Sequence, residues 1–180
     1  MDHLGIARAA IVGYSMGGSV AMKVLIDHPD RVRVAVIGGS LGFNRHDSEH
    51  DETPRLGPDL LRGMPLSEAM LASAPPNFPK PSPQQREMMR RMDAAQDPIA
   101  LGAETVSHEG LWVEDAQIKA IRVPTLIING GLDRPEFYKE ARTNFKNLQF
   151  ETFEGLGHGP AMASPLFLKS VPGFLDEHRG

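Results

Sequence analysis

Four short apolar runs alternate along the chain with stretches of helical periodicity. The runs are Ala9–Val12, Val32–Ile37, Val123–Asn129 and Leu148–Phe153. The first three contain few polar side chains, as is typical of parallel strands covered on both faces, whereas the last alternates and suits an exposed edge of a sheet. The pattern therefore predicts an α/β fold with a mostly parallel sheet of about four strands, flanked by helices.

Helices are predicted after three of these runs. The first follows Val12 and ends before Pro29, the second follows Asp133, and the last begins at Pro165 with a kink at Pro172. Their apolar faces are Val20, Ala21, Val24 and Leu25 in the first, Phe137, Ala141 and Phe145 in the second, and Leu168, Val171 and Leu175 in the third. Strand, crossover helix and strand in this order indicate parallel pairing.

The segment 42–115 has a different character, because it has no strand pattern and is rich in proline. Ser82-Pro83 and Asp97-Pro98 each place a capping residue before a proline, which predicts two helix starts. We interpret 42–115 as a small helical lid inserted within a single domain, 1–180. Most of the methionines are here, and two interpretations of five of them are open: a helix core, which we favour, or a pliable apolar wall over a ligand. They are Met64, Met70, Met88, Met89 and Met92.

Composition narrows the function. The 180 residues are long enough for one domain with a core, and the formal net charge of −4 argues against nucleic acid as a partner. The chain has no cysteine, which excludes disulfides and thiolate chemistry. No apolar run reaches the ~18 residues of a membrane span, and the first residues do not resemble a signal peptide, so we expect a cytoplasmic protein.

The first apolar run ends at Gly13-Tyr14-Ser15-Met16-Gly17-Gly18, directly before a helical pattern. This is a nucleophile elbow in its expected setting, and we predict that Gly13 and Gly17 are needed because a Cβ there would meet the next element. The turn would raise the Ser15 hydroxyl above the sheet. An ordinary strand-to-helix loop is the alternative.

Two further residues follow predicted strands. Asp133 follows the third run, and His158 lies in a glycine-rich loop after the fourth. Loops at the carboxyl edge of one parallel sheet converge, and a serine hydroxyl becomes a nucleophile when a carboxylate-oriented imidazole removes its proton. Separately, Asp133 could cap the next helix and His158 could be a turn residue; together with the elbow, a catalytic triad is the better interpretation.

These three stretches resemble the α/β-hydrolase family, in its esterase, lipase and haloperoxidase-like group. The pieces that carry the resemblance are Gly13–Gly18, Val123–Asp133 and Gly155–His158, and the order Ser, Asp, His is that of the family. The resemblance implies that Ser15 is the nucleophile, His158 the base and then acid, and Asp133 the orienting carboxylate. It also implies that the Met16 amide binds the oxyanion, that Tyr14 lies at the same oxyanion and substrate site, and that no cofactor or metal is needed.

The chain departs from the family in one respect, since the family has several strands before the elbow and only twelve residues precede Gly13 here. We therefore expect either the C-terminal part of a longer fold or an unusually short form. The usual second oxyanion amide would be missing, which typically costs about 10² to 10³ in turnover. Ala9–Val12 would become a bare apolar edge, which predicts self-association.

One other motif competes with the triad. His46-Asp47-Ser48-Glu49-His50 fits an inverted zinc-protease pattern. That site needs a rigid helix, but the stretch 44–53 has no apolar stripe to dock one, so we interpret it as a solvated acidic loop rather than a zinc site.

Two hypotheses follow. In the first, the chain is a serine hydrolase that cleaves a small carboxylic ester, or a related acyl compound, through an acyl-enzyme. In the second, it is a non-catalytic remnant that binds a small apolar ligand or a partner chain. Labelling of Ser15 by a fluorophosphonate separates them, because only an activated serine reacts fast.

Overall fold

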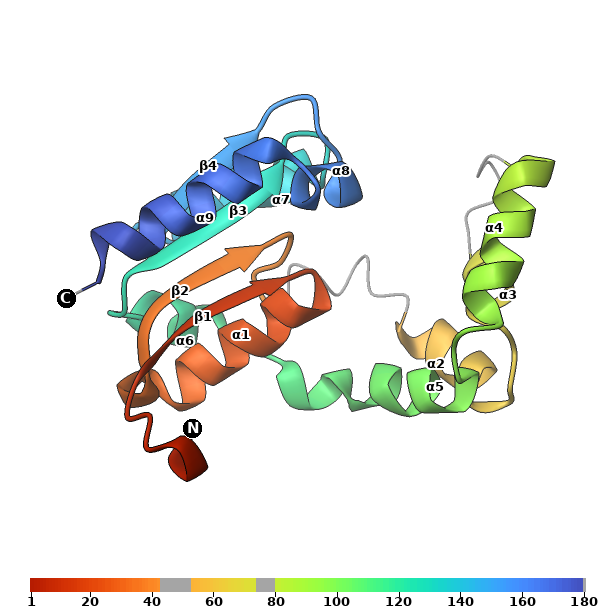
Figure 1. The fold of residues 1–180 in the computed structure, drawn as a ribbon, viewed down its shortest axis with the longest axis horizontal. Helices are drawn as coiled ribbons and strands as arrows, with labels where there is room; N and C mark the ends of the chain where they lie inside the picture. The colour runs from red at the N-terminus through yellow and green to blue at the C-terminus, as the bar shows by residue number, and fades with distance from the viewer. Residues whose placement is uncertain (43–52, 74–79, 180) are drawn as a thin grey trace. The chain divides into compact units, whose positions relative to one another are not determined.

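The computed structural model describes residues 1–42, 53–73 and 80–179. The chain divides into two compact units, which Figure 1 draws as a ribbon. The first, here called the sheet unit, comprises Met1–His46 and Leu111–Gly180. The second, the helical unit, comprises Asp47–Gly110.

The sheet unit is built on four parallel strands in the order β1-β2-β3-β4. Their bounds are β1 Ala9–Tyr14, β2 Val32–Gly38, β3 Thr125–Gly130 and β4 Gln149–Phe153. The predicted α/β class and the predicted parallel sheet are confirmed. Because strand order follows chain order, each connection crosses over one face of the sheet and every strand ends at the same edge.

Helices cover both faces of this sheet. Side chains alternate along a strand, so Ala35 and Ile37 of β2 pack on one side and Val34 and Val36 on the other. The first side is covered by α1 (Met16–Asp27), α6 (Asp115–Ala120) and α7 (Pro135–Asn144), and the second by α8 (His158–Met162) and α9 (Pro165–Glu177) (Figure 1). Short 3₁₀ turns span Asp2–Leu4, Pro29–Arg31 and Ser107–Leu111. Burying each large aliphatic side chain stabilises the unit by about 1.5 to 3 kcal/mol.

The apolar face of α9 differs from the prediction at one position. Phe174 is buried, and Phe167 and Val171 pack beside it against the sheet, whereas Leu168 is 72% exposed. The prediction that Leu168 points inward is therefore wrong. The stripe at i, i+4 and i+7 begins one residue earlier, at Phe167, which turns Leu168 toward solvent.

The helical unit contains α2 (Thr53–Leu61), α3 (Leu66–Ser73), α4 (Pro83–Asp93) and α5 (Pro98–Val106). The two predicted helix starts are confirmed. Ser82 and Gln85 form a reciprocal capping box at α4, and the Asp97 carboxylate accepts hydrogen bonds from the amides of Ile99 and Ala100 at α5. Gly102 lets α5 approach α2 closely, since a Cβ there would lie 2.6 Å from the Leu61 nitrogen.

The five methionines of this segment do not form a core. Met70, Met88 and Met92 are exposed, Met88 to 59%, and Met64 and Met89 are half-buried. The favoured core interpretation is therefore wrong. The spacing correctly predicts a helix, but α4 buries none of its own residues, so spacing alone does not show which face of the helix is covered.

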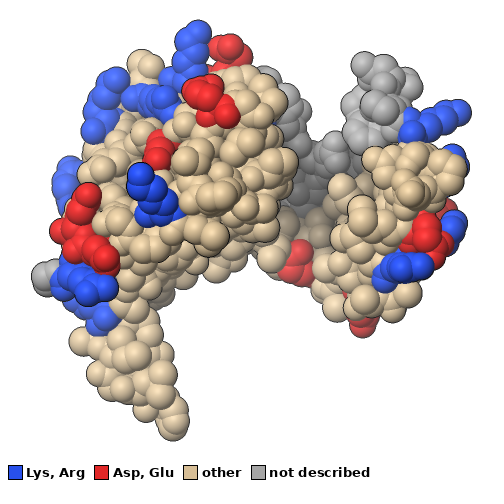
Figure 2. Space-filling model, turned by 45° about the horizontal axis from the view of Figure 1, so that its top comes forward, with Lys and Arg blue, Asp and Glu red and all other residues tan. Residues whose placement is uncertain are grey.

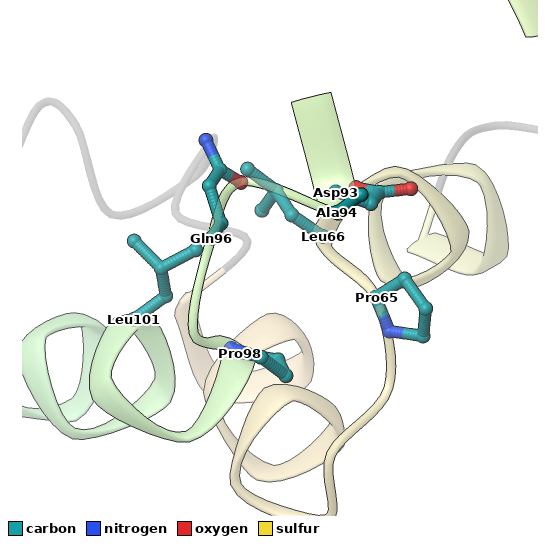
Figure 3. A pocket seen from close by; sticks show the side chains of 7 residues that line it. All are labelled: Pro65, Leu66, Asp93, Ala94, Gln96, Pro98 and Leu101. Atoms are coloured by element: carbon teal, nitrogen blue, oxygen red, sulfur yellow. The ribbon is translucent and has the colours of Figure 1, made fainter. Parts of the chain in front are cut away.

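A small pocket of about 220 Å³ lies within the helical unit, where α3 begins, α4 ends and α5 begins (Figure 3). Its one carboxylate, that of Asp93, already accepts hydrogen bonds from the Ser67 amide at 3.0 Å and from the Ser67 hydroxyl. Asp93 thus satisfies the first turn of α3 and ties α4 to it. The rest of the lining is largely apolar: Pro65, Leu66, Ala94, Gln96, Pro98 and Leu101.

Two observations concern possible binding to membranes and to charged partners. Within the described residues, no helix is both long enough and apolar enough to cross a bilayer. On the face drawn in Figure 2, the Lys and Arg side chains of the described residues are interspersed with those of Asp and Glu.

Candidate active site

The turn between β1 and α1 holds Ser15 in a strained conformation. Ser15 has φ 56° and ψ −124°, an unusual region for a residue with a side chain, and its amide donates to the Gly38 carbonyl at 2.8 Å. Gly13 makes this turn possible, because a Cβ there would lie 2.1 Å from the Gly17 carbonyl oxygen. The sharp reversal presents the hydroxyl beyond the carboxyl end of β1.

The second glycine that the elbow needs is not the predicted one. A Cβ on Gly17 would meet nothing within 4 Å, so the predicted packing role of Gly17 is wrong. A Cβ on Gly18 would lie 3.0 Å from the Gly38 carbonyl oxygen and 3.1 Å from the Ser40 Cβ. The close approach of α1 to β2 therefore falls one residue further along the helix.

Asp133 follows β3 and His158 follows β4, at the same edge of the sheet as Ser15. The Asp133 amide donates to the Gly130 carbonyl at 3.0 Å, which turns the chain sharply after β3. His158 begins α8 after the loop that follows β4. The Asp133 side chain is only 10% exposed, whereas that of His158 is 43% exposed. Arg134, and not Asp133, occupies the cap position of α7.

The three side chains meet in one hydrogen-bonded chain. The Ser15 Oγ lies 2.9 Å from His158 Nε2, and His158 Nδ1 lies 2.7 Å from Asp133 Oδ2. A carboxylate oxygen can only accept, so Nδ1 carries the proton of the neutral ring and Nε2 keeps a lone pair toward the serine hydroxyl. This is the tautomer in which an imidazole can take a proton from serine.

Met16 and Tyr14 flank the serine on either side. Met16 is the first residue of α1, so its amide has no acceptor within the helix and can meet an anion beside Ser15. Tyr14 instead faces the histidine: its hydroxyl donates to the His158 carbonyl oxygen at 2.6 Å, and the ring centroids lie 5.3 Å apart. Burial raises the pKa of the Tyr14 hydroxyl, and the charge of Asp133 adds to the rise.

Sequence reasoning missed the end of β2. Gly38 and Gly39 pass directly beneath the rings of Tyr14 and His158, and Ser40 pairs with Ser19 of α1 through their hydroxyls at 2.7 Å. The signal was present, since Gly38-Gly39-Ser40 follows a buried strand at the same edge as the elbow. A glycine pair at the end of a strand predicts a turn, but it does not show which side chains the turn will approach.

The competing motif His46–His50 lies outside the described residues. Among the residues that the structure does describe, no group of three or more His, Asp or Glu side chains is arranged to hold a metal ion.

Comparison with known proteins gives a consistent picture. The profile of a family described as "Alpha/beta hydrolase family" matches residues 1–168. A 2-hydroxy-6-oxononadienedioate/2-hydroxy-6-oxononatrienedioate hydrolase of Pseudomonas sp is 40% identical over 72 residues, which cover 39% of this chain and 24% of that protein. A 2-hydroxymuconate semialdehyde hydrolase of Pseudomonas putida is 50% identical over 44 residues, which cover 24% of this chain and 16% of that protein. The aligned stretches thus span a quarter or less of these relatives.

Solved structures share the fold over almost the whole chain. A carboxylesterase structure from Nitrososphaera gargenis has a TM-score of 0.74 at 16% identity, over 99% of this chain and 68% of that one. A thermophilic esterase from Thermogutta terrifontis has a TM-score of 0.72 at 21% identity, over 98% of this chain and 68% of that one. At these identities the likeness concerns the fold.

Proposed function

The chain belongs to the α/β-hydrolase family, and from this premise we propose that it is a serine hydrolase that cleaves a small carboxylic ester, or a related acyl compound, through an acyl-enzyme on Ser15. The observation that carries the proposal is the continuous hydrogen-bonded chain from the Ser15 hydroxyl through the His158 imidazole to the Asp133 carboxylate. The likeness to solved esterases supports the fold in which such a chain would act.

In the first half of the proposed reaction, His158 Nε2 removes the proton of the Ser15 hydroxyl as its oxygen attacks the ester carbonyl carbon. The negative charge that develops on the carbonyl oxygen meets the amide of Met16 at the start of α1, where the helix dipole favours an anion. Asp133 stabilises the imidazolium and keeps its orientation. When the tetrahedral intermediate collapses, Nε2–H gives its proton to the departing alcohol.

In the second half, a water molecule takes the place of the alcohol. His158 removes a proton from the water, the resulting hydroxide attacks the acyl carbon, and Ser15 leaves with the proton returned from Nε2. The acid is released and the free enzyme is restored. Each step uses the same two hydrogen bonds, so loss of either one should slow both halves.

The experiment uses p-nitrophenyl acetate with rapid mixing. We expect a burst of p-nitrophenol close to one equivalent per chain, followed by slower turnover, and no burst with Ser15→Ala. Ser170→Ala is the matched control, since the Ser170 hydroxyl of α9 donates to Glu151 of β4 at 2.8 Å and is not part of the hydrogen-bonded chain of Ser15. Hydrolysis that survives Ser15→Ala would reject the proposal.

A panel of substrates tests which chemical bond the protein cleaves. Two relatives are named as hydrolases of an unsaturated 2-hydroxy-6-oxo acid and of a 2-hydroxymuconate semialdehyde, so one such compound is compared with the ester. Preference for the oxo acid with dependence on Ser15 would keep the serine hydrolase and correct the substrate class. A folded protein that turns over none of these compounds and binds an apolar ligand would support the non-catalytic alternative.

Three sequence-based predictions stay proposals. Residues 42–115 are proposed to form a lid within a single domain, and the protein is proposed to be cytoplasmic. Self-association through Ala9–Val12 has support from the sheet: among the described residues β1 pairs only with β2, and its Val12 is 45% exposed. A second copy could add its own β1 to this apolar edge.

Sedimentation equilibrium tests the self-association. A lysine on an edge strand opposes pairing, so Val12→Lys should weaken the dimer at least about tenfold, while Val20→Lys, at an exposed valine of α1, should leave it unchanged. A wild-type protein that is strictly monomeric at micromolar concentration would contradict the proposal.

A further inference from the structure

We propose that Tyr14 and Gly39 position the imidazole of His158, Tyr14 by anchoring the main chain that carries it and Gly39 by leaving room for the ring. This inference rests on the proposed function, because it assigns to these two residues the task of keeping Nε2 in line with the Ser15 hydroxyl. Both act through His158 and are positioning residues.

The loop that carries His158 has little rigidity of its own. Glycine occupies positions 155, 157 and 159, and at Gly157 and Gly159 an added Cβ would meet nothing within 4 Å. The helix that follows, α8, has only five residues and no side-chain cap at its start. Glycines lose more conformational entropy on ordering than other residues, and so short a helix has little stability alone. The loop therefore depends on contacts with the rest of the sheet unit: the Leu132 amide donates to the Leu156 carbonyl at 2.9 Å and Ala161 of α8 is buried, but neither contact is made by His158 itself.

Tyr14 supplies an anchor for His158. Its hydroxyl donates a 2.6 Å hydrogen bond to the carbonyl oxygen of His158 itself, across 144 positions of sequence. Its ring lies between two others, with centroids 5.3 Å from the ring of His158 and 5.5 Å, edge-on, from that of Phe167 of α9. Such tilted and edge-to-face arrangements are the preferred geometry of aromatic neighbours. Tyr14 directly precedes Ser15, so two adjacent residues contact His158: Tyr14 binds its main chain and Ser15 its ring.

Gly39 provides the space in which the imidazole lies. A Cβ on Gly39 would come within 2.8 Å of His158 Cε1 and 3.0 Å of Tyr14 Cε1. The backbone cannot withdraw, because the Gly39 amide donates to the Ile128 carbonyl of β3 at 2.8 Å and its φ of 62° is poorly accessible to other residues. The bare backbone at the end of β2 therefore fixes one side of the imidazole.

The ionisation of Tyr14 agrees with an anchoring role. Burial and the nearby Asp133 charge both raise the pKa of its hydroxyl, so it remains a protonated donor throughout the pH range in which a histidine base works. With its proton donated to the His158 carbonyl oxygen, this hydroxyl can contact a substrate only as a hydrogen-bond acceptor. We therefore assign Tyr14 to the support of the base, and its expected contact with the substrate stays a prediction.

The test compares Tyr14→Phe, which keeps the ring and removes the hydrogen bond, with wild type. In Tyr14→Phe we expect kcat on p-nitrophenyl acetate to fall about tenfold and KM to stay within twofold of wild type, because a less rigid His158 affects the chemical step rather than binding. Tyr138→Phe is the matched control, since it makes the same change at the other tyrosine of the chain, which α7 carries with its ring in the core. Gly39→Ala should cost about a hundredfold in kcat, and Gly173→Ala, where a Cβ meets nothing within 4 Å, should cost nothing.

A second readout does not require turnover. The proton between His158 Nδ1 and Asp133 gives a far-downfield NMR resonance when the ring is held, and we expect this signal to broaden or vanish in Tyr14→Phe. Equal kcat and an unchanged resonance in Tyr14→Phe would overturn the inference. A raised KM with unchanged kcat would also overturn it and return Tyr14 to the substrate site. If wild type shows no Ser15-dependent hydrolysis, the proposed function fails, and the resonance still decides the inference.

Discussion

Different interactions stabilise the sheet unit and the helical unit internally. In the sheet unit, strands and helices bury apolar side chains on both faces of one sheet, and Ile37, Ile127 and Ile128 are completely inaccessible. In the helical unit, Leu60 and Ala69 are also completely inaccessible, but α4 buries none of its residues, and helix caps and the Asp93 carboxylate stabilise its helices. All three residues of the hydrogen-bonded triad lie in the sheet unit. A centre that needs ångström accuracy is thus carried by the part with the deep core.

The largest effect is expected when one chemical change is made in each unit. Asp133→Asn replaces an acceptor with a group that can present N–H to His158, which favours the wrong tautomer and should slow Ser15 acylation by about 10³ to 10⁴. Asp97→Asn makes the same change at the α5 cap, where asparagine serves equally well, and should leave acylation unchanged. Stopped-flow measurement of the burst rate checks both. Comparable losses in the two variants would show that activity does not reside in the sheet unit alone.

The next largest effect is on stability, because side chains of the sheet unit and of α4 differ in burial. Ile127→Ala removes a fully buried side chain from β3 and should lower the free energy of unfolding by about 2 to 5 kcal/mol. Met88→Ala truncates an exposed side chain of α4 and should change it by no more than about 0.5 kcal/mol. Urea unfolding followed by circular dichroism measures both. A Met88→Ala cost near that of Ile127→Ala would mean that the helical unit packs its methionines after all.

A smaller, local effect is expected at the α5 cap. Asp97→Ala leaves the amides of Ile99 and Ala100 without their acceptor, which should cost about 1 kcal/mol. Hydrogen exchange should therefore accelerate about fivefold in the first turn of α5 and remain unchanged in β2 and β3. Faster exchange throughout the sheet would contradict the separation of the two units.

The last effect is confined to alkaline solution, where it concerns the pH dependence of stability. Burial raises the pKa of Tyr138 above its ordinary value near 10. Above that pH the unfolded chain loses the tyrosine proton while the folded chain retains it, so the free energy of unfolding declines as pH rises, by up to about 1.4 kcal/mol per pH unit. Tyr138→Phe should flatten this decline between about pH 10 and 11. Parallel curves for the two proteins, in urea titrations across this range, would indicate that Tyr138 ionises freely in the folded state.

Much of the fold, and the proximity of the three candidate site residues, could be predicted from the sequence for one reason. Ser15, Asp133 and His158 each follow a strand, and the carboxyl ends of parallel strands share an edge, so order along the chain implied proximity in space. Local rules also identified the starts of α4 and α5, because capping depends only on neighbouring residues.

The single-residue features that the sequence did not predict depend on contacts between segments far apart in the chain. The stripe of α9 begins at Phe167 because that side chain meets Tyr14 of β1, and no periodicity distinguishes it from Leu168. The role of Gly18 is decided by the Gly38 carbonyl, and that of Tyr14 by a carbonyl 144 positions away. The exposure of the methionines depends on what covers a helix face, which spacing cannot reveal.

The central claim is that Ser15 is activated by His158. It is tested most directly by incubating the protein with a fluorophosphonate and following the mass of the intact chain, with the labelled peptide then sequenced. We predict a single adduct, on Ser15, that forms quickly in wild type, is absent in Ser15→Ala and forms at least about a hundredfold more slowly in His158→Ala. An adduct on another residue, or a Ser15 adduct that forms equally fast without the imidazole, would contradict it.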